Sequence, residues 1–134
     1  MSEDIYGALL PIPHQYIQKL ASGEKDVFVK FGRYKFLSEG KRLVFYDSGI
    51  HMLVGESEIK RVVYDDPEKI WRMFGSRIFL EEKEFKEYSS RSPLGPRSPK
   101  RNVMTACVLK NFRKYAKPKK PEKRVTPSGY YLRS

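Results

Sequence analysis

One segment constrains the fold more than any other, because residues 103–109 (Val-Met-Thr-Ala-Cys-Val-Leu) are apolar at every position except Thr105. A short apolar run of this kind is typical of a strand that is buried on both faces of a sheet. The chain has 134 residues, which is enough to bury one hydrophobic core without disulfides or a metal. We therefore predict one small domain in which Val103–Leu109 is the central strand.

The other elements predicted from the sequence are short. Strands are predicted at Asp26–Phe31, Leu43–Tyr46, Ile50–Val54 and Ser57–Tyr64. Helices are predicted after Pro13 as far as Gly23, from the Asp66-Pro67 cap as far as Gly75, and around Glu81–Tyr88. Short strands joined by glycine turns close more easily into a barrel than into a parallel sheet. The predicted class is therefore α+β, with a small, strongly bent or barrel-like sheet.

The positive charge lies almost entirely in the last third of the chain. Residues 1–90 carry 14 Lys and Arg against 15 Asp and Glu, whereas residues 91–134 carry 13 against one. A basic field of this kind attracts polyanions, which release counterions when they meet it. Nucleic acid is the partner that this distribution favours, and a solvated, solubilising tail is the alternative. An acidic membrane surface is disfavoured, because the segment lacks the apolar face of an interfacial helix.

Composition divides the chain into two parts. Residues 1–112 form the predicted domain and include a flexible loop, 89–101, rich in serine and proline. From residue 113 the composition becomes linker-like, with Lys-Pro repeats, and residues 113–134 are predicted to form a basic C-terminal arm. The arm ends in Tyr130-Tyr-Leu132, which is a candidate for folding back onto the barrel as an added edge strand.

The order of these elements, together with two short motifs, resembles a known superfamily. The first motif comes directly after the first predicted helix and reads Ser22-Gly-Glu-Lys-Asp-Val-Phe-Val-Lys30. The second motif lies further along the chain and reads Leu37-Ser-Glu-Gly-Lys-Arg-Leu-Val-Phe45. Over residues 9–115 the chain resembles the PUA-like superfamily, especially its ASCH branch and the small archaeal families of unknown function placed there. Gly23 and Lys25 match the ASCH motif, whereas Phe28 and Lys30 replace its Glu or Thr and its Arg. The resemblance implies a PUA-like pseudo-β-barrel with two or three short helices and a groove for RNA or a modified nucleoside.

The resemblance also implies an alternative, enzymatic function. Some small ASCH-like proteins are amidohydrolases that act on an acylated cytidine through a lysine, a threonine and a glutamate. Carried over by position, Lys25 would supply the lysine, and Glu56 or Glu58 would supply the carboxylate. Phe28 cannot supply a hydroxyl nucleophile, which disfavours an enzyme. Ser22 is the nearest hydroxyl that could substitute for it.

We therefore predict a non-enzymatic RNA-binding module that uses a barrel groove together with the basic loop and arm. A protein-interaction accessory subunit, whose arm folds onto a partner, is a further alternative. The predicted nucleic-acid-binding residues are Lys25, Lys30, Arg91, Arg97, Lys100, Arg101, Lys117, Lys119, Lys120, Lys123 and Arg124. Candidates for stacking on unpaired bases are Tyr34, Phe36, Tyr46, Tyr64, Trp71, Tyr115, Tyr130 and Tyr131.

Several other classes of function are disfavoured by the composition. One cysteine and two histidines do not make a disulfide framework or a zinc finger, so no metal or cofactor is expected. Cys107 is predicted to be a buried apolar residue, and His14 and His51 to be structural or surface residues. No apolar run approaches the roughly 20 residues that span a bilayer, and the N-terminus lacks a signal-peptide pattern. A soluble cytoplasmic protein is expected, and the scarcity of Asn, Gln and Cys favours a thermophilic source.

Overall fold

The computed structural model describes residues 5–32, 34, 37–90, 103–126 and 129–133. Its elements in chain order are β1 (Ile5–Ile12), α1 (His14–Ala21), β2 (Val27–Phe31), β3 (Arg42–Asp47), β4 (Met52–Asp65), α2 (Pro67–Phe74), the 3-10 turn η1 (Gly75–Arg77), α3 (Glu82–Ser90), β5 (Met104–Lys119) and β6 (Tyr130–Arg133). Within these residues, six strands form one sheet in the order β2-β5-β4-β3-β1-β6. The predicted α+β class is confirmed.

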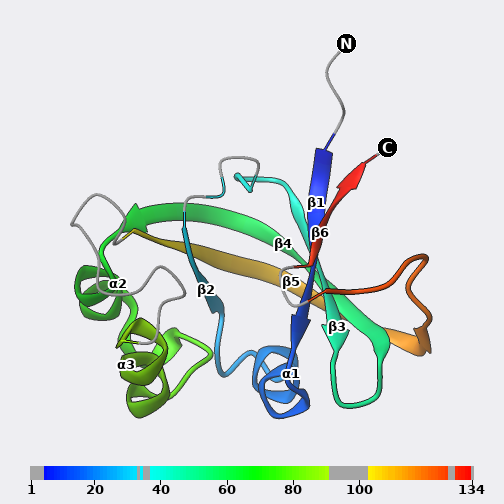
Figure 1. Cartoon of the computed structure of the whole chain (residues 1–134), viewed down its shortest axis with the longest axis horizontal. Coiled ribbons are helices and arrows are strands. Elements are labelled where there is room, and N and C mark those ends of the chain that lie inside the picture. The colour runs from blue at the N-terminus through cyan, green and yellow to red at the C-terminus, as the bar shows by residue number, and fades with distance from the viewer. Residues whose placement is uncertain (1–4, 33, 35–36, 91–102, 127–128, 134) are drawn as a thin grey trace.

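The sheet is mixed and curves into a half-barrel (Figure 1). The pair β1–β3 is parallel, whereas β2–β5, β5–β4, β4–β3 and β1–β6 are antiparallel. The long strands β4 and β5 run side by side along the whole molecule, with α2 and α3 at one end (Figure 1). At the other end the chain leaves β5 and returns as β6 beside β1. We call the paired strands β4 and β5 the ribbon; other elements of the fold meet it at each of its two ends.

Two sequence predictions about strand length were wrong. The strands predicted at Ile50–Val54 and Ser57–Tyr64 are one strand, β4, of 14 residues. The change to a linker predicted from residue 113 does not occur, because β5 has 16 residues and continues as far as Lys119. A division of the chain at residue 112 falls inside this strand.

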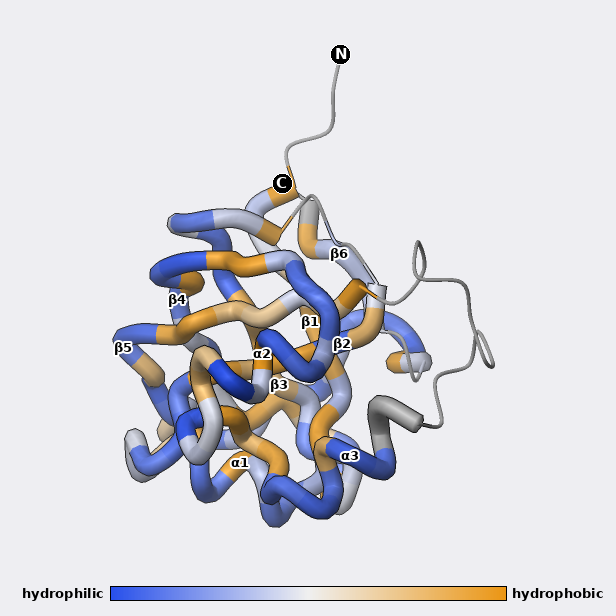
Figure 2. The backbone as a smooth tube through the Cα atoms, turned by 90° about the vertical axis from the view of Figure 1, so that its left-hand side faces the viewer, coloured by the Kyte–Doolittle hydropathy of each residue, from blue (hydrophilic) through white to orange (hydrophobic). Residues whose placement is uncertain are grey.

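The core lies against the first half of β5, as the apolar run predicted. Residues 104–109 are all buried, and β5 has a hydrogen-bonded neighbour on each side. In Figure 2 hydrophobic stretches of the backbone are seen along the strands of the sheet. Cys107 is fully buried, as predicted, and burial raises the pKa of its thiol to about 12. The thiol therefore stays protonated and unreactive at neutral pH.

The predicted helices are present, with their expected ends. The side chain of Asp66 caps α2 by accepting a hydrogen bond of 3.0 Å from the Lys69 N–H, and Pro67 is the first helical residue. Gly23 follows α1 with a φ of 81° and Gly75 follows α2 with a φ of 48°, the left-handed region that favours glycine. No helix of the described chain is long and apolar enough to cross a membrane.

Strand β1 was not predicted from the sequence, because Gly7 and Pro11 weaken its strand pattern. The structure explains the glycine. A Cβ at Gly7 would lie 2.0 Å from the backbone carbonyl oxygen of Arg42 on the parallel neighbour β3. Only glycine allows the two strands to pair so closely. The residue that weakens the strand pattern of β1 in the sequence is therefore required by its position in the sheet.

The return of the chain into β6 depends on a second glycine, Gly129, and this gives a testable prediction. Gly129 has a φ of 69°, and a Cβ there would lie 2.1 Å from the carbonyl oxygen of Leu9. We expect Gly129→Ala to lower the free energy of unfolding by more than the roughly 1–2 kcal/mol of left-handed strain alone. It should also speed amide exchange in β6, which hydrogen–deuterium exchange would detect.

Gly40→Ala is the matched control for this prediction. Gly40 has a φ of 88°, but a Cβ there would meet no atom within 4 Å. This variant should show the backbone strain without the clash, and β6 should keep its protection. Equal losses of stability in the two variants, with β6 unchanged in both, would contradict the role given to Gly129.

Candidate functional site

The first candidate site is a cleft beside Phe28 and Lys30, the positions at which this chain departs from the ASCH motif. It has a volume of about 390 Å³ and lies between α1, β2 and α3; we call it the motif cleft. Its lining residues are Pro11, Ile12, Pro13, Tyr16, Phe28, Val29, Lys30, Phe79, Leu80, Glu84 and Glu87. Phe28 and Lys30 are two positions apart on β2, so both side chains point to the same face of the sheet. The strand thus brings an aromatic ring and an amine to one opening.

Three aromatic rings, those of Tyr16, Phe28 and Phe79, are among the residues that line the motif cleft. Phe28 stacks on Phe79 with ring centroids 5.1 Å apart, and Tyr16 meets Phe79 edge-on with centroids 5.3 Å apart. The Tyr16 hydroxyl donates a hydrogen bond to Glu84 on α3. Burial lowers the pKa of Lys30, so this amine holds its proton less tightly than an exposed lysine. A planar ligand with a polar edge suits such a lining.

Lys25, the lysine that matches the ASCH motif, joins separate segments of the fold. It is buried, its Nζ donates a hydrogen bond of 2.6 Å to the carbonyl oxygen of Ser76, and it lies 3.6 Å from Glu81 Oε2. The same carboxylate accepts a hydrogen bond of 2.7 Å from Lys19, and these two lysines lower the pKa of Glu81. Lys25 therefore ties the turn after α1 to η1 and the start of α3.

The predicted carboxylates Glu56 and Glu58 lie on β4 and have other partners. Glu58 pairs with Lys110 at 3.6 Å. The Oε2 atom of Glu56 lies 3.1 Å from Arg42 Nε and 3.2 Å from Arg113 Nη2, and its Oε1 accepts a hydrogen bond of 2.8 Å from the Tyr115 hydroxyl. In the described part of the chain, no hydrogen bond or ion pair joins Lys25 to either glutamate, so the predicted catalytic residues are not brought together by direct contact.

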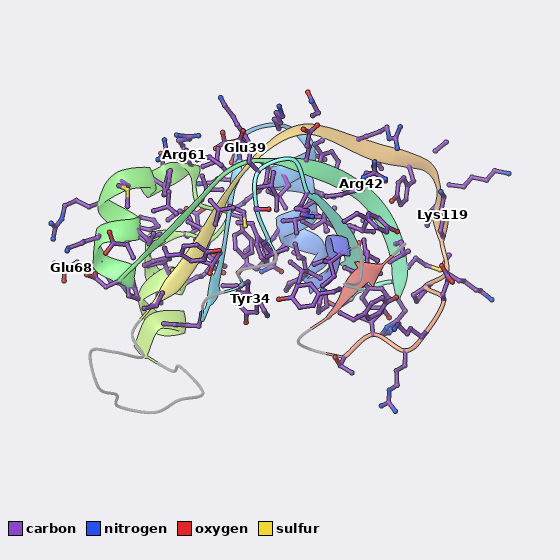
Figure 3. The ribbon with its side chains drawn as sticks, turned by 90° about the horizontal axis from the view of Figure 1, so that it is seen from above. Tyr34, Glu39, Arg42, Arg61, Glu68 and Lys119 are labelled. Atoms are coloured by element: carbon purple, nitrogen blue, oxygen red, sulfur yellow. The ribbon has the colours of Figure 1, made fainter. Side chains whose placement is uncertain are left out.

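A second candidate site lies at the opposite end of the ribbon, where the chain returns from β5 to β6. It is a groove of about 580 Å³, which we call the tyrosine groove. Its lining residues are Tyr6, Leu9, Arg42, Val44, Leu53, Glu56, Tyr115, Lys119, Glu122, Lys123, Tyr130, Tyr131 and Leu132. Figure 3 shows Arg42 and Lys119 at this end, away from Glu68 on α2. Sequence reasoning named three of its tyrosines but missed Tyr6 and Arg42, since nothing local links β1 and β3 to the arm.

Ammonium groups lie over two of the rings in the tyrosine groove. Lys119 Nζ is 4.6 Å from the centroid of Tyr115, and Lys123 Nζ is 4.6 Å from the centroid of Tyr130. Burial and the hydrogen bond to Glu56 raise the pKa of Tyr115 to about 12, and burial also raises the pKa of Tyr130. Both phenols are therefore neutral at physiological pH, and the groove presents aromatic faces beside fixed positive charges.

The exposed cations of the basic arm beyond Arg113 differ from those that precede them on the sheet. Six of them, which we call the arm cations, are exposed to solvent: Lys114, Lys117, Lys119, Lys120, Lys123 and Arg124. In the described residues none of the six forms an ion pair with a carboxylate, whereas Lys110 and Arg113 pair with glutamates of β4. The predicted phosphate-binding residues of the arm therefore keep their charge available to a partner.

The remaining predicted site residues are dispersed. Arg91, Arg97, Lys100 and Arg101, with the loop 89–101 that carries them, fall largely on residues 91–102, outside the described residues; Phe36 lies outside them too. Trp71 is partly buried and packs on Phe85 with ring centroids 5.0 Å apart. No group of three or more His, Cys, Asp or Glu side chains in the described chain could hold a metal ion.

The two histidines have local partners. His14 Nδ1 lies 2.6 Å from Asp47 Oδ2, and His51 Nδ1 lies 3.1 Å from the Tyr46 hydroxyl. Asp47 is almost fully buried, and it also accepts a hydrogen bond of 2.8 Å from the Gly49 N–H. These contacts fix the turn between β3 and β4, which agrees with a structural role for His14.

Solved structures with the same arrangement of strands and helices define the class of fold. The ASCH protein of Zymomonas mobilis aligns with a TM-score of 0.75 at 16% identity, covering 96% of this chain and 88% of that one. A variant of the same protein aligns with a TM-score of 0.79 at 18% identity, covering 98% of this chain and 92% of that one. The fold is thus the ASCH-type, PUA-like half-barrel that the motifs indicated.

Sequence comparison identifies the family. A family model described as "Domain of unknown function (DUF365)" matches residues 5–134, and the chain belongs to this family. An uncharacterised archaeal protein of Methanocaldococcus jannaschii, MJECS03, is 33% identical over 96 residues, which is 69% of this chain and 89% of that protein. The predicted resemblance to a family of unknown function, with an archaeal relative and an ASCH-type fold, is confirmed.

Proposed function

We propose that this protein is a non-enzymatic RNA-binding module in which the arm cations contact phosphates and the motif cleft holds a base. The observation that carries the proposal is the set of six exposed arm cations that have no carboxylate partner in the described chain. Cations of this kind neutralise RNA phosphates and release the counterions condensed on the RNA, which is the electrostatic basis of RNA binding.

The motif cleft supports the same function. PUA-like folds of the ASCH type are compatible with RNA binding, and this cleft combines aromatic side chains with the amine of Lys30 at its opening. At about 390 Å³ it falls in the size range of small-molecule sites, into which a single base fits. The buried, paired position of Lys25 and the apolar Phe28 support a binding role rather than the alternative hydrolytic one.

Fluorescence anisotropy of a labelled single-stranded RNA of about ten nucleotides tests the proposal. At about 50 mM salt we expect saturable binding with a Kd in the micromolar range or below, because non-specific affinity rises steeply as salt falls. Polyglutamate of similar length is the control for charge alone, and it should compete much less well than unlabelled RNA. Absence of saturable RNA binding at low salt would reject the proposed function.

A further inference from the structure

The tyrosine groove has features that neither the core nor the phosphate contacts require. Four tyrosines, on β1, β5 and β6, converge on it from parts of the chain more than a hundred residues apart. Tyr6 is 44% exposed, and Tyr115 and Tyr130 are partly exposed. Large aromatic rings left open beside one groove are not what packing of the core would produce, since burial of those rings would stabilise the fold more.

The charges in the groove suit a ligand that carries phosphate, because the cations that line it (Arg42, Lys119 and Lys123) outnumber the carboxylates (Glu56 and Glu122). The carboxylate of Glu56 is held between the guanidinium groups of Arg42 and Arg113 and the Tyr115 hydroxyl, so its charge is compensated. The ammonium groups of Lys119 and Lys123 lie 4.6 Å from the centroids of two rings. A base that displaces either ammonium group and stacks on that ring face would keep the displaced cation within reach of its own phosphate.

The size of the groove favours an unpaired nucleotide rather than a duplex as its ligand. Its volume of about 580 Å³ is in the range that accommodates a small organic ligand such as one nucleotide. Bases of a duplex already stack on each other and cannot enter, whereas unpaired bases are free to lie on aromatic side chains. Two of the arm cations, Lys119 and Lys123, line the same groove and would contact the neighbouring phosphates.

We propose that the tyrosine groove is a base-stacking site for an unpaired nucleotide of single-stranded RNA, with Tyr115 and Tyr130 as the stacking surfaces and Lys119 and Lys123 on the adjacent phosphates. This inference rests on the proposed function, since it requires that the arm binds RNA. It assigns a second, separate base site, at the end of the ribbon opposite the motif cleft. The protein would therefore engage an unpaired segment at two places along one strand.

The test uses the full chain and a single-stranded RNA of about ten nucleotides that carries 2-aminopurine at each position in turn. Stacking on tyrosine quenches 2-aminopurine, so wild-type protein should quench a limited set of positions. Tyr115→Leu with Tyr130→Leu keeps apolar bulk but removes both flat rings. We expect this double variant to lose about 10-fold in RNA affinity and the quenching at one position, with an unchanged salt slope.

Two further arms keep the test decisive if the double variant is unstable. Met73→Ala removes a large, exposed apolar side chain on α2, outside both candidate sites, and should change neither affinity nor quenching. An abasic site at the quenched position should weaken binding to wild-type protein by a similar factor, with no substitution in the protein. Full affinity and unchanged quenching in the double variant, or no effect of the abasic site, would overturn this inference while RNA binding stands. No binding by wild-type protein would instead reject the proposed function itself.

Discussion

Replacing Ala106 by Asp is expected to lower the free energy of unfolding at neutral pH by about 4 kcal/mol or more. Ala106 is fully buried on β5, opposite Val29 of β2 and Val63 of β4, so a carboxylate there would have no partner. Because small domains have only about 5–15 kcal/mol of stability, a loss of this size would unfold a large part of the population. Urea unfolding followed by circular dichroism measures the effect.

Ala106→Asn separates the effect of charge from that of size. Both side chains overfill the site, and both bury an unpaired polar group, which costs about 3 kcal/mol. Only Asp adds a charge, and burial would raise its pKa above the value in the unfolded chain. The deficit of Asp relative to Asn should therefore be absent near pH 4 and grow by about 1.4 kcal/mol per pH unit above it. A constant difference between the variants across this range would show that the site is open to water.

The second half of β5 shows why sequence patterns gave only part of this fold. Phe112 and Tyr115 are three residues apart, a spacing that does not alternate as a strand should. The structure accommodates them through irregularities: Asn111 has a φ of 55°, and the register with β4 shifts between Glu56 and Glu58. Phe112 then stacks on Phe45 with ring centroids 5.9 Å apart. A bulge changes which side chains face the core, and no local composition signals it.

The tyrosine groove, too, could be predicted from the sequence only in part. The residue types of the arm were predictable, because its richness in lysine, arginine and tyrosine is visible in the sequence. Their assembly was not, because the tyrosine groove depends on the parallel pairing of β1 with β3 and on β6 pairing with β1. Both contacts join segments that are distant in sequence. Arg42 could be placed beside Tyr115 only once Glu56 was seen to bind both.

Reversing four arm cations is expected to remove most of the affinity for RNA at low salt. The variant carries Glu at Lys119, Lys120, Lys123 and Arg124, all of which are exposed, so the fold should tolerate it. If about five cations of the wild-type protein meet phosphates of a single strand, log Kd should change with log salt with a slope of magnitude about 3.5. Raising salt from roughly 50 to 200 mM would then weaken wild-type binding about 100-fold.

The four-site variant should show a nearly flat salt dependence, since about one contact would remain and the reversed charges repel phosphate. Affinity measured by anisotropy at several salt concentrations gives both slopes. The matched control reverses Lys60, Arg61, Lys69 and Lys83, which are also exposed and have no ion pair in the described residues, but lie on β4, α2 and α3, outside both candidate sites. It changes the net charge of the protein by the same amount, so it reports the effect of overall charge alone.

The comparison of the two reversals decides where RNA is held. If the contacts are local to the arm, the control keeps a steep slope and loses little affinity beyond the long-range repulsion, which salt screens within about 10 Å at 0.1 M. If net charge alone drives binding, both variants should weaken equally. Equal slopes for wild-type protein and the four-site variant would mean that the arm is not in contact with phosphate. In that case the phosphate contacts that set the slope would have to lie elsewhere on the protein, because the slope reports phosphate contacts and not base contacts.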